Sequence, residues 1–168
     1  MAVKISRPED LPAQHRAEHE GYEYTRRRFV RRGESGNTLV SVYEIPPGKA
    51  AYPYHYHLKD EETFCILRGE GTLHTPQGEQ LVHAGDMIFF PAGSEGAHKL
   101  TNTGSETLVY IDFDVIHDLD AAVYPDSGKI GLWGKDINRV YPSRRMSPIT
   151  TVNNARRKAG SLRLFRLF

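Results

Sequence analysis

The stretch of sequence that decides the fold runs from Gly48 to Gly69 and reads GKAAYPYHYHLKDEETFCILRG. Side chains on an extended strand alternate between its two faces, so His55 and His57 point the same way. A tight turn after His57 would bring a carboxylate of the next strand beside them. Glu62 fits best, because an uninterrupted strand then runs on to the glycine. The stretch therefore predicts two imidazoles and a carboxylate converging on one point.

A second informative stretch lies at residues 85–102 and reads GDMIFFPAGSEGAHKLTN. It offers His98 as a further ligand, with Asn102 on the same face of a predicted strand. Three histidines and one carboxylate would then surround one cavity.

Short β-prone stretches separated by Gly, Pro, Asn and Asp extend on both sides of these motifs. This pattern is typical of a sandwich or barrel of antiparallel strands, and no alternation of helix and strand indicates a parallel α/β sheet. We predict an all-β fold with strands at residues 39–43, 62–67, 71–74, 80–82, 87–90, 97–100 and 108–113.

The two stretches, in this order and about 40 residues apart, resemble the paired motifs of the cupin superfamily. The resemblance covers about residues 39–113. The chain is also similar to a group of small bacterial cupins in which a segment like its residues 124–129 follows the barrel. It implies a double-stranded β-helix, the jelly-roll cupin barrel. Gly93 is followed by four residues before His98, where the family pattern has two. The ligands that the resemblance implies for one divalent metal ion per chain are His55, His57, Glu62 and His98.

The expected metal follows from these ligand types. Neutral imidazoles with one carboxylate suit iron, manganese, nickel, copper or zinc, whereas calcium and magnesium prefer oxygen-rich ligand sets. Four protein ligands leave one or two positions open for water, dioxygen or a bidentate substrate. We therefore expect one divalent transition metal per chain.

Two further residues could take part in catalysis. Tyr110 and Asp112 share one face of the last predicted strand, and could act as an acid–base pair if that face is the inner one. In the alternative, Val109, Ile111 and Phe113 fill the barrel and the other two residues are solvated. The alternative is favoured, because its inward set is wholly apolar.

The segment from Tyr124 to Lys129 contains Pro, Asp, Ser and Gly and is interpreted first as a turn. In the second interpretation it is a lid at the mouth of the barrel, where Lys129 or Tyr124 contacts an anionic or hydroxylated substrate. Asn102, on the face of His98, is a third candidate for substrate binding.

The length of 168 residues and the 39% of apolar residues fit a single domain. We expect the barrel at residues 38–115, preceded by an arm at 1–37 that could add a strand to a neighbouring molecule. A loop-rich segment at 116–141 would pack on the barrel, and a basic tail at 142–168 would follow, with an amphipathic helix over residues 154–168. Apolar residues in both appendages favour a homodimer.

Composition also limits the partners and the compartment. The chain has 22 basic and 21 acidic residues, which disfavours nucleic-acid binding, and no apolar run is long enough to span a bilayer. A single cysteine excludes an intrachain disulfide and fits a cytoplasmic protein.

These features predict a metal-binding protein with a small-molecule ligand. The favoured function is that of a metalloenzyme acting on a sugar, sugar phosphate or carboxylic acid by Lewis-acid isomerase or lyase chemistry. A non-catalytic small-molecule-binding module and an iron-dependent dioxygenase are the alternatives. A metabolite-sensing regulator is disfavoured, because no helix-turn-helix pattern accompanies the barrel.

Overall fold

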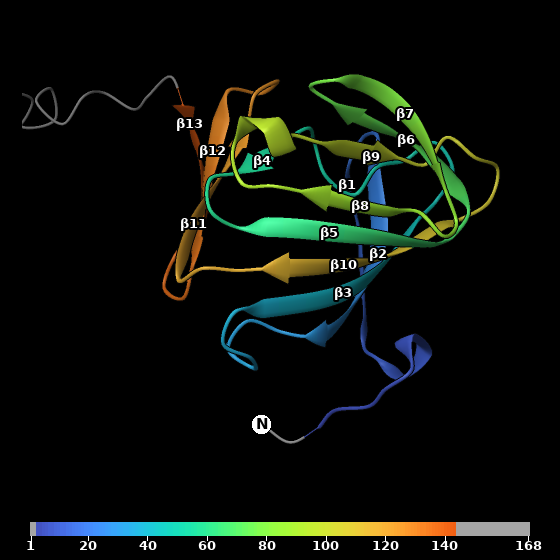
Figure 1. The fold of residues 1–168 in the computed structure, drawn as a ribbon, viewed down its shortest axis with the longest axis horizontal. Coiled ribbons are helices and arrows are strands. Elements are labelled where there is room, and N and C mark those ends of the chain that lie inside the picture. Colours follow the sequence, from blue (N-terminus) through green and yellow to red (C-terminus); the bar gives the residue numbers. More distant parts are fainter. Residues whose placement is uncertain (1–2, 144–168) are drawn as a thin grey trace, which may run out of the picture.

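The structure is a computed structural model that describes residues 3–143, and its regular elements are almost all β-strands (Figure 1). None of the described segments is a helix of the length and apolar character needed to cross a membrane. Two short 3-10 turns are present, η1 (Pro8–Asp10) and η2 (Ser94–Gly96). The strands are β1 (Ala13–His19), β2 (Tyr22–Val30), β3 (Thr38–Ile45), β4 (Tyr56–His57), β5 (Glu61–Arg68), β6 (Glu70–Thr75), β7 (Gly78–His83), β8 (Met87–Phe90), β9 (Lys99–Thr101), β10 (Leu108–Val115), β11 (Leu119–Tyr124), β12 (Lys129–Gly134) and β13 (Asn138–Pro142).

The strands form three sheets. A six-stranded sheet has the order β1-β2-β3-β10-β5-β8, and a three-stranded sheet has the order β7-β6-β9. Both contribute to one apolar core, which joins Tyr43, Ile66 and Tyr110 of the first sheet to Leu73 and Leu100 of the second. A smaller sheet, β13-β12-β11-β4, lies at one end of the pair (Figure 1). This is the predicted all-β jelly roll, the double-stranded β-helix.

All seven predicted strands are present. The strand at Met87–Phe90 has the predicted bounds, and the others differ by a few residues at their ends. The prediction succeeded here because glycine turns separate these strands clearly. Gly69 and Gly85, for example, both adopt a positive φ that other residues rarely tolerate.

The loop-rich character predicted for residues 116–141 is wrong, because this segment forms β11, β12 and the start of β13. Strand β11 begins Leu-Asp-Ala-Ala, a sequence of low β-propensity. Its buried positions are Asp120 and Ala122 rather than large apolar residues. The alternation of buried and exposed side chains was therefore present, but hydrophobicity did not reveal it.

The N-terminal arm also differs from the expectation. Residues 13–30 form β1 and β2 of the chain's own sheet, where β2 pairs with β3, instead of reaching out as a free arm. The run Arg26–Arg28 hides this strand in the sequence. Arg26 is nevertheless partly buried, since its guanidinium donates to the hydroxyls of Tyr43 and Tyr52. The basic tail, with its predicted helix, lies outside the described residues.

Asn102 ties together three segments next to the core. Its side chain is fully buried, and Nδ2 donates to the carbonyls of Ile45 (2.7 Å) and Glu106 (2.8 Å). Its Oδ1 accepts a hydrogen bond from the Gly104 amide at 3.0 Å. All its polar atoms are therefore used by the backbone, which gives Asn102 a structural role in place of the predicted contact with substrate.

We expect Asn102→Ala to lower the free energy of unfolding by about 2–4 kcal/mol, because it leaves buried backbone groups without partners. Urea denaturation of the two proteins measures the difference. Thr103→Ala is the matched control, since its hydroxyl bonds to Thr72 at an exposed position and its loss should change stability little. Equal unfolding midpoints for Asn102→Ala and the wild type would contradict this role.

Candidate metal centre

The four predicted metal ligands come together at the end of the core next to β4. His57 belongs to β4 and Glu62 to β5, whereas His55 and His98 pair through their backbones just outside the strands. The His55 amide donates to the His98 carbonyl at 3.1 Å, and the His98 amide returns a bond of 2.9 Å. This bridge holds two ligands from distant stretches of sequence beside each other.

The longer turn before His98 does not displace that residue. The extra residues form η2, whose Gly96 amide donates to the Gly93 carbonyl at 3.1 Å. Gly96 has no room for a side chain, because a Cβ there would lie 1.9 Å from the Pro91 carbonyl oxygen. The turn is thus compact and delivers His98 to the expected place.

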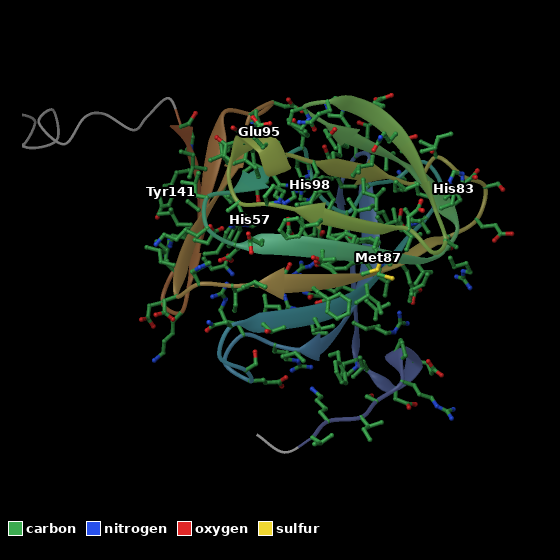
Figure 2. All side chains as sticks on the ribbon, in the orientation of Figure 1. His57, His83, Met87, Glu95, His98 and Tyr141 are labelled. Atoms are coloured by element: carbon green, nitrogen blue, oxygen red, sulfur yellow. The ribbon has the colours of Figure 1, made fainter. Side chains whose placement is uncertain are left out.

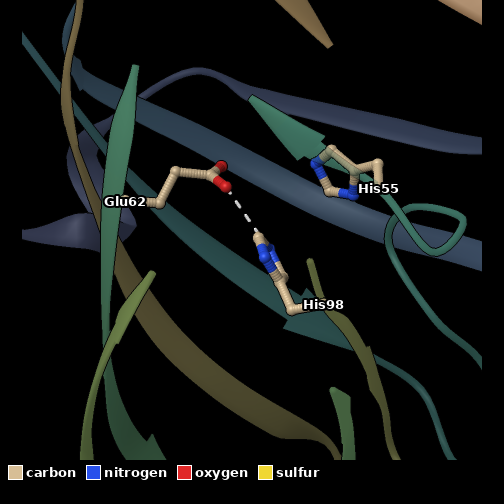
Figure 3. Close-up of side chains that lie close together, drawn as sticks. All are labelled: His55, Glu62 and His98. Atoms are coloured by element: carbon tan, nitrogen blue, oxygen red, sulfur yellow. Dashed lines mark ion pairs between the residues drawn. The ribbon is translucent and has the colours of Figure 1, made fainter. Parts of the chain in front are cut away.

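The side chains of His55, Glu62 and His98 face one another (Figure 3). Each offers one ligand atom that lies within 4.8 Å of the other two. Glu62 Oε2 is 3.3 Å from His98 Nε2 and 3.7 Å from His57 Nε2, so the fourth ligand reaches the same carboxylate. His55 and His98 are 7% and 2% exposed. The centre is therefore compact and almost closed to solvent.

The outward nitrogens of two imidazoles are held by backbone carbonyls. His55 Nδ1 donates to the Pro53 carbonyl and His98 Nδ1 to the Gly96 carbonyl, each at 2.9 Å. In a neutral ring this leaves Nε2 as an acceptor with a free lone pair. The Nε2 of His98 is buried and has no hydrogen-bond partner among residues 3–143. An unpartnered acceptor beside a carboxylate is what a metal ion would satisfy, so these residues fit a transition-metal ion.

His57 is oriented by a residue that sequence reasoning missed. Its Nδ1 lies 2.5 Å from Oδ2 of Asp120, whose side chain is fully buried. The other oxygen of Asp120 accepts from the backbone amides of Lys59 (2.8 Å) and Asp60 (3.3 Å). Carboxylates that hold a ligating histidine in this way fix its tautomer and its ring orientation. No spacing rule could have identified Asp120, because β11 lies far along the chain.

Burial and neighbouring charges divide the titrating groups of the site into two sets. Burial lowers the pKa of His55 to about 4 and the pKa of His98 well below its usual value, so both rings are neutral at pH 7. Burial would also lower the pKa of His57, but the hydrogen bond to Asp120 and the charge of Glu62 raise it to about 9. Burial raises the pKa of Glu62 to about 7. At pH 7 the ring of His57 is therefore protonated in the metal-free protein.

A small cavity touches the centre. It measures about 20 Å³, which is room for about one water molecule, and its walls include His55, Glu62 and His98. Phe64 closes one side, with its ring 5.4 Å from that of His98 and perpendicular to it. The space suits an ion or a water molecule rather than a whole sugar.

Tyr110 and Asp112 point into the core, so the favoured alternative that Val109, Ile111 and Phe113 fill the barrel is wrong. Tyr110 is 1% and Asp112 6% exposed, and both line the cavity. Phe113, by contrast, is 42% exposed on the outer face of the sheet. The prediction assumed that the more apolar face of the strand is the inner one, and it failed because the outer face of this sheet is apolar too.

Tyr124 reaches the centre, whereas Lys129 lies on the surface. The Tyr124 ring stacks on His55, with ring centres 5.5 Å apart and planes 14° apart. Burial, then the charges of Glu62 and Asp120, raises the pKa of Tyr124 to about 12. Lys129 lies opposite Tyr124 across the β11–β12 hairpin, where it is exposed. Residues 124–129 thus form the predicted turn.

Comparison with known proteins agrees with this architecture. Residues 41–114 match the family model described as "Cupin domain". A curated relative, the oxalate-binding protein of Thermotoga maritima, is 32% identical over 73 residues, which are 44% of this chain and only 58% of the relative.

Two solved structures share the fold. A sugar phosphate isomerase from a cupin superfamily, from Silicibacter pomeroyi, has a TM-score of 0.76 and 19% identity over 89% of this chain and 98% of that one. A predicted oxalate decarboxylase from Thermotoga maritima has a TM-score of 0.61 and 22% identity over 68% of this chain and 100% of that one. At these identities the similarity concerns the fold.

Proposed function

Since residues 41–114 match the model of a cupin domain, we propose that this chain binds one divalent transition-metal ion and uses it on a small polar ligand that binds through oxygen. The observation that supports this best is the buried, unpartnered Nε2 of His98, 3.3 Å from the carboxylate of Glu62. The class of ligand is a carboxylic acid, a sugar or a sugar phosphate. The proposed metal ligands are His55, His57, Glu62 and His98.

A bound ion would supply Lewis acidity toward carbonyl, carboxylate and hydroxyl oxygens. Around it the chain provides groups that hold protons. Tyr124 stays protonated at neutral pH and can donate a hydrogen bond to an oxygen of the ligand beside His55. Tyr110 lines the cavity and is also protonated, because burial and the charge of Asp112 raise its pKa well above the usual value. Asp112 lines the same cavity and is the candidate residue that orients Tyr110.

A non-catalytic binding role is the second candidate. It is favoured by the small volume of the cavity, about 20 Å³, and by the likeness to a protein named for binding oxalate. A two-carbon dicarboxylate is among the smallest ligands that can grip one ion through two oxygens. Binding without turnover would identify this role.

The test is to remove metal from the full chain and to reload it separately with zinc and with iron(II). Oxalate, hydroxy acids and sugar phosphates are then added with and without air, and both binding and product are measured. Turnover with either metal in the absence of air supports Lewis-acid chemistry. Turnover only with iron and only in air would overturn it in favour of dioxygenase chemistry, and binding without turnover would assign the binding role.

We also propose that the chain forms a homodimer through the outer face of the six-stranded sheet. Met87 and Phe89 of β8 are 74% and 59% exposed there, and Phe113 of β10 is 42% exposed (Figure 2 labels Met87). Thr63 of β5 pairs with both phenylalanines, so the three strands carry one continuous apolar surface. Apolar surfaces of this kind favour protein contacts.

Light scattering on the full chain should give the mass of a dimer, and Phe89→Lys should shift it to the mass of a monomer. Ile5→Lys is the control, because Ile5 is 92% exposed but lies outside this surface. A wild-type protein that stays monomeric at micromolar concentration would refute the dimer.

The cytoplasm is the proposed compartment. Cys65 is a free thiol on β5 and the chain has no second cysteine to pair with it. Proteins of reducing compartments typically keep their thiols in this state.

A further inference from the structure

We propose that Glu62, Asp112 and Asp114 bind a second divalent cation, of the hard kind represented by Mg²⁺ and Mn²⁺. This site would lie next to the histidine centre and share Glu62 with it. The proposal stands on the three carboxylates and does not require the reaction proposed above.

Strand register brings the three carboxylates together. Asp112 and Asp114 are alternate residues of β10, so their side chains lie on the same face. Asp114 is the register partner of Glu62 on β5, and Asp112 is that of the buried Phe64. One oxygen of each carboxylate lies within 4.8 Å of the other two. Cation–oxygen distances of about 2.0–2.6 Å let one ion contact oxygens with this separation.

A second observation points to a missing partner. Asp112 is 6% exposed, and its Oδ1 is buried without a hydrogen-bond donor in the part of the chain that the structure describes. Buried acceptors without partners are rare in folded proteins, so an unpartnered oxygen of Asp112 in a cluster of three carboxylates indicates a ligand.

The protein supplies no direct counter-charge to the two aspartates. Within residues 3–143, no nitrogen of Lys, Arg or His lies within 4.0 Å of Asp112 or Asp114. The charge of Arg26 acts on Asp112 from further away, but its guanidinium is already bonded to Tyr43, Tyr52 and Gln14. Among the described residues, Asp112 and Asp114 therefore have no direct ion-pair partner, and only Glu62 has a histidine beside it.

The ligand chemistry of this cluster differs from that of the histidine centre. Glu62, Asp112 and Asp114 would coordinate a divalent ion through carboxylate oxygens alone. An all-oxygen ligand set selects Mg²⁺ or Mn²⁺, whereas the imidazoles next to it select softer transition metals. Because the two sites prefer different metal ions, binding to one can be measured apart from binding to the other.

The experiment counts Mn²⁺ ions bound by the metal-free full chain, using the electron paramagnetic resonance signal of free Mn²⁺. We expect two ions in the wild type, one in Asp112→Asn and one in His98→Ala. Asp118→Asn is the control for loss of one negative charge, since Asp118 is exposed on the approach to β11, and it should bind two. Mg²⁺ alone should raise the melting temperature of the wild type and of His98→Ala, but not of Asp112→Asn.

The proposal is overturned if Asp112→Asn binds as many Mn²⁺ ions as the wild type. Asp114→Asn repeats the measurement if Asp112→Asn fails to fold. If His98→Ala binds as many ions as the wild type while Asp112→Asn binds one fewer, the histidine centre is refuted and the carboxylate site stands. Failure of the two proposals is thus distinguishable.

Discussion

His98→Ala should lower the affinity of the metal-free protein for a first-row transition metal by about a hundredfold or more. Loss of groups that merely orient a ligand already weakens binding by about 10–100 fold, and His98 is proposed to be a ligand itself. Its Nε2 is buried and has no hydrogen-bond partner among the described residues, so removing this atom breaks no hydrogen bond that they show. Competition with a chromogenic chelator measures the affinity for zinc or nickel.

His74→Ala provides the matched control for this measurement. His74 is about half exposed and lies 3.9 Å from Glu79 on the surface, so its loss should leave metal affinity unchanged. A His98→Ala protein that folds and binds zinc as tightly as the His74→Ala protein would remove His98 from the centre.

Asp120→Asn should weaken metal binding by about 10–100 fold at pH 9, because Asp120 holds the ring of His57 in place. The loss should become smaller toward pH 7. In the wild type His57 has a pKa of about 9, so below pH 9 a proton competes with the metal and apparent affinity falls about tenfold per pH unit. The variant lacks the negative charge that raises this pKa, so its affinity falls less as the pH is lowered.

Affinity for zinc measured with a chelator from pH 6.5 to 9 gives both profiles. Asp118→Asn is again the control, since it removes a nearby exposed carboxylate of the same chain segment. A merely structural role for Asp120 would lower the affinity equally at every pH. Parallel profiles for Asp120→Asn and the wild type would therefore contradict its action through His57.

The sequence predicted the parts of the site that depend on local spacing. His55 and His57 are separated by one residue and Glu62 follows after a short turn, so strand alternation alone places them on one side. Turn signals likewise gave the seven central strands. His98 required the family pattern as well, because its approach to His55 depends on a backbone bridge between distant segments.

The remaining features depend on tertiary contacts that no local pattern encodes. Asp120 meets His57 only because β11 pairs with β4, and this pairing was hidden by the low hydrophobicity of the later strands. The side-chain directions of Tyr110 and Asp112 were predicted wrongly. When both faces of a sheet carry apolar residues, hydrophobicity does not tell which face is turned toward the core. Phe113, on the outer face, contributed to the error.

The narrow attachment of β11 to the rest of the chain bears on how an ion could enter an almost closed centre. Two register pairs, Ala122 with His57 and Val123 with Tyr56, form the ladder between β11 and β4, and Asp120 adds side-chain bonds to the residues that follow β4. Local opening of so short a ladder needs far less free energy than global unfolding. It would release Asp120 and Tyr124 from the histidines together while the core stays intact. Strands β11, β12 and β13 would then move away from β4 to let an ion in or out, and a bound ion would hold them in place and slow the exchange of their amide hydrogens.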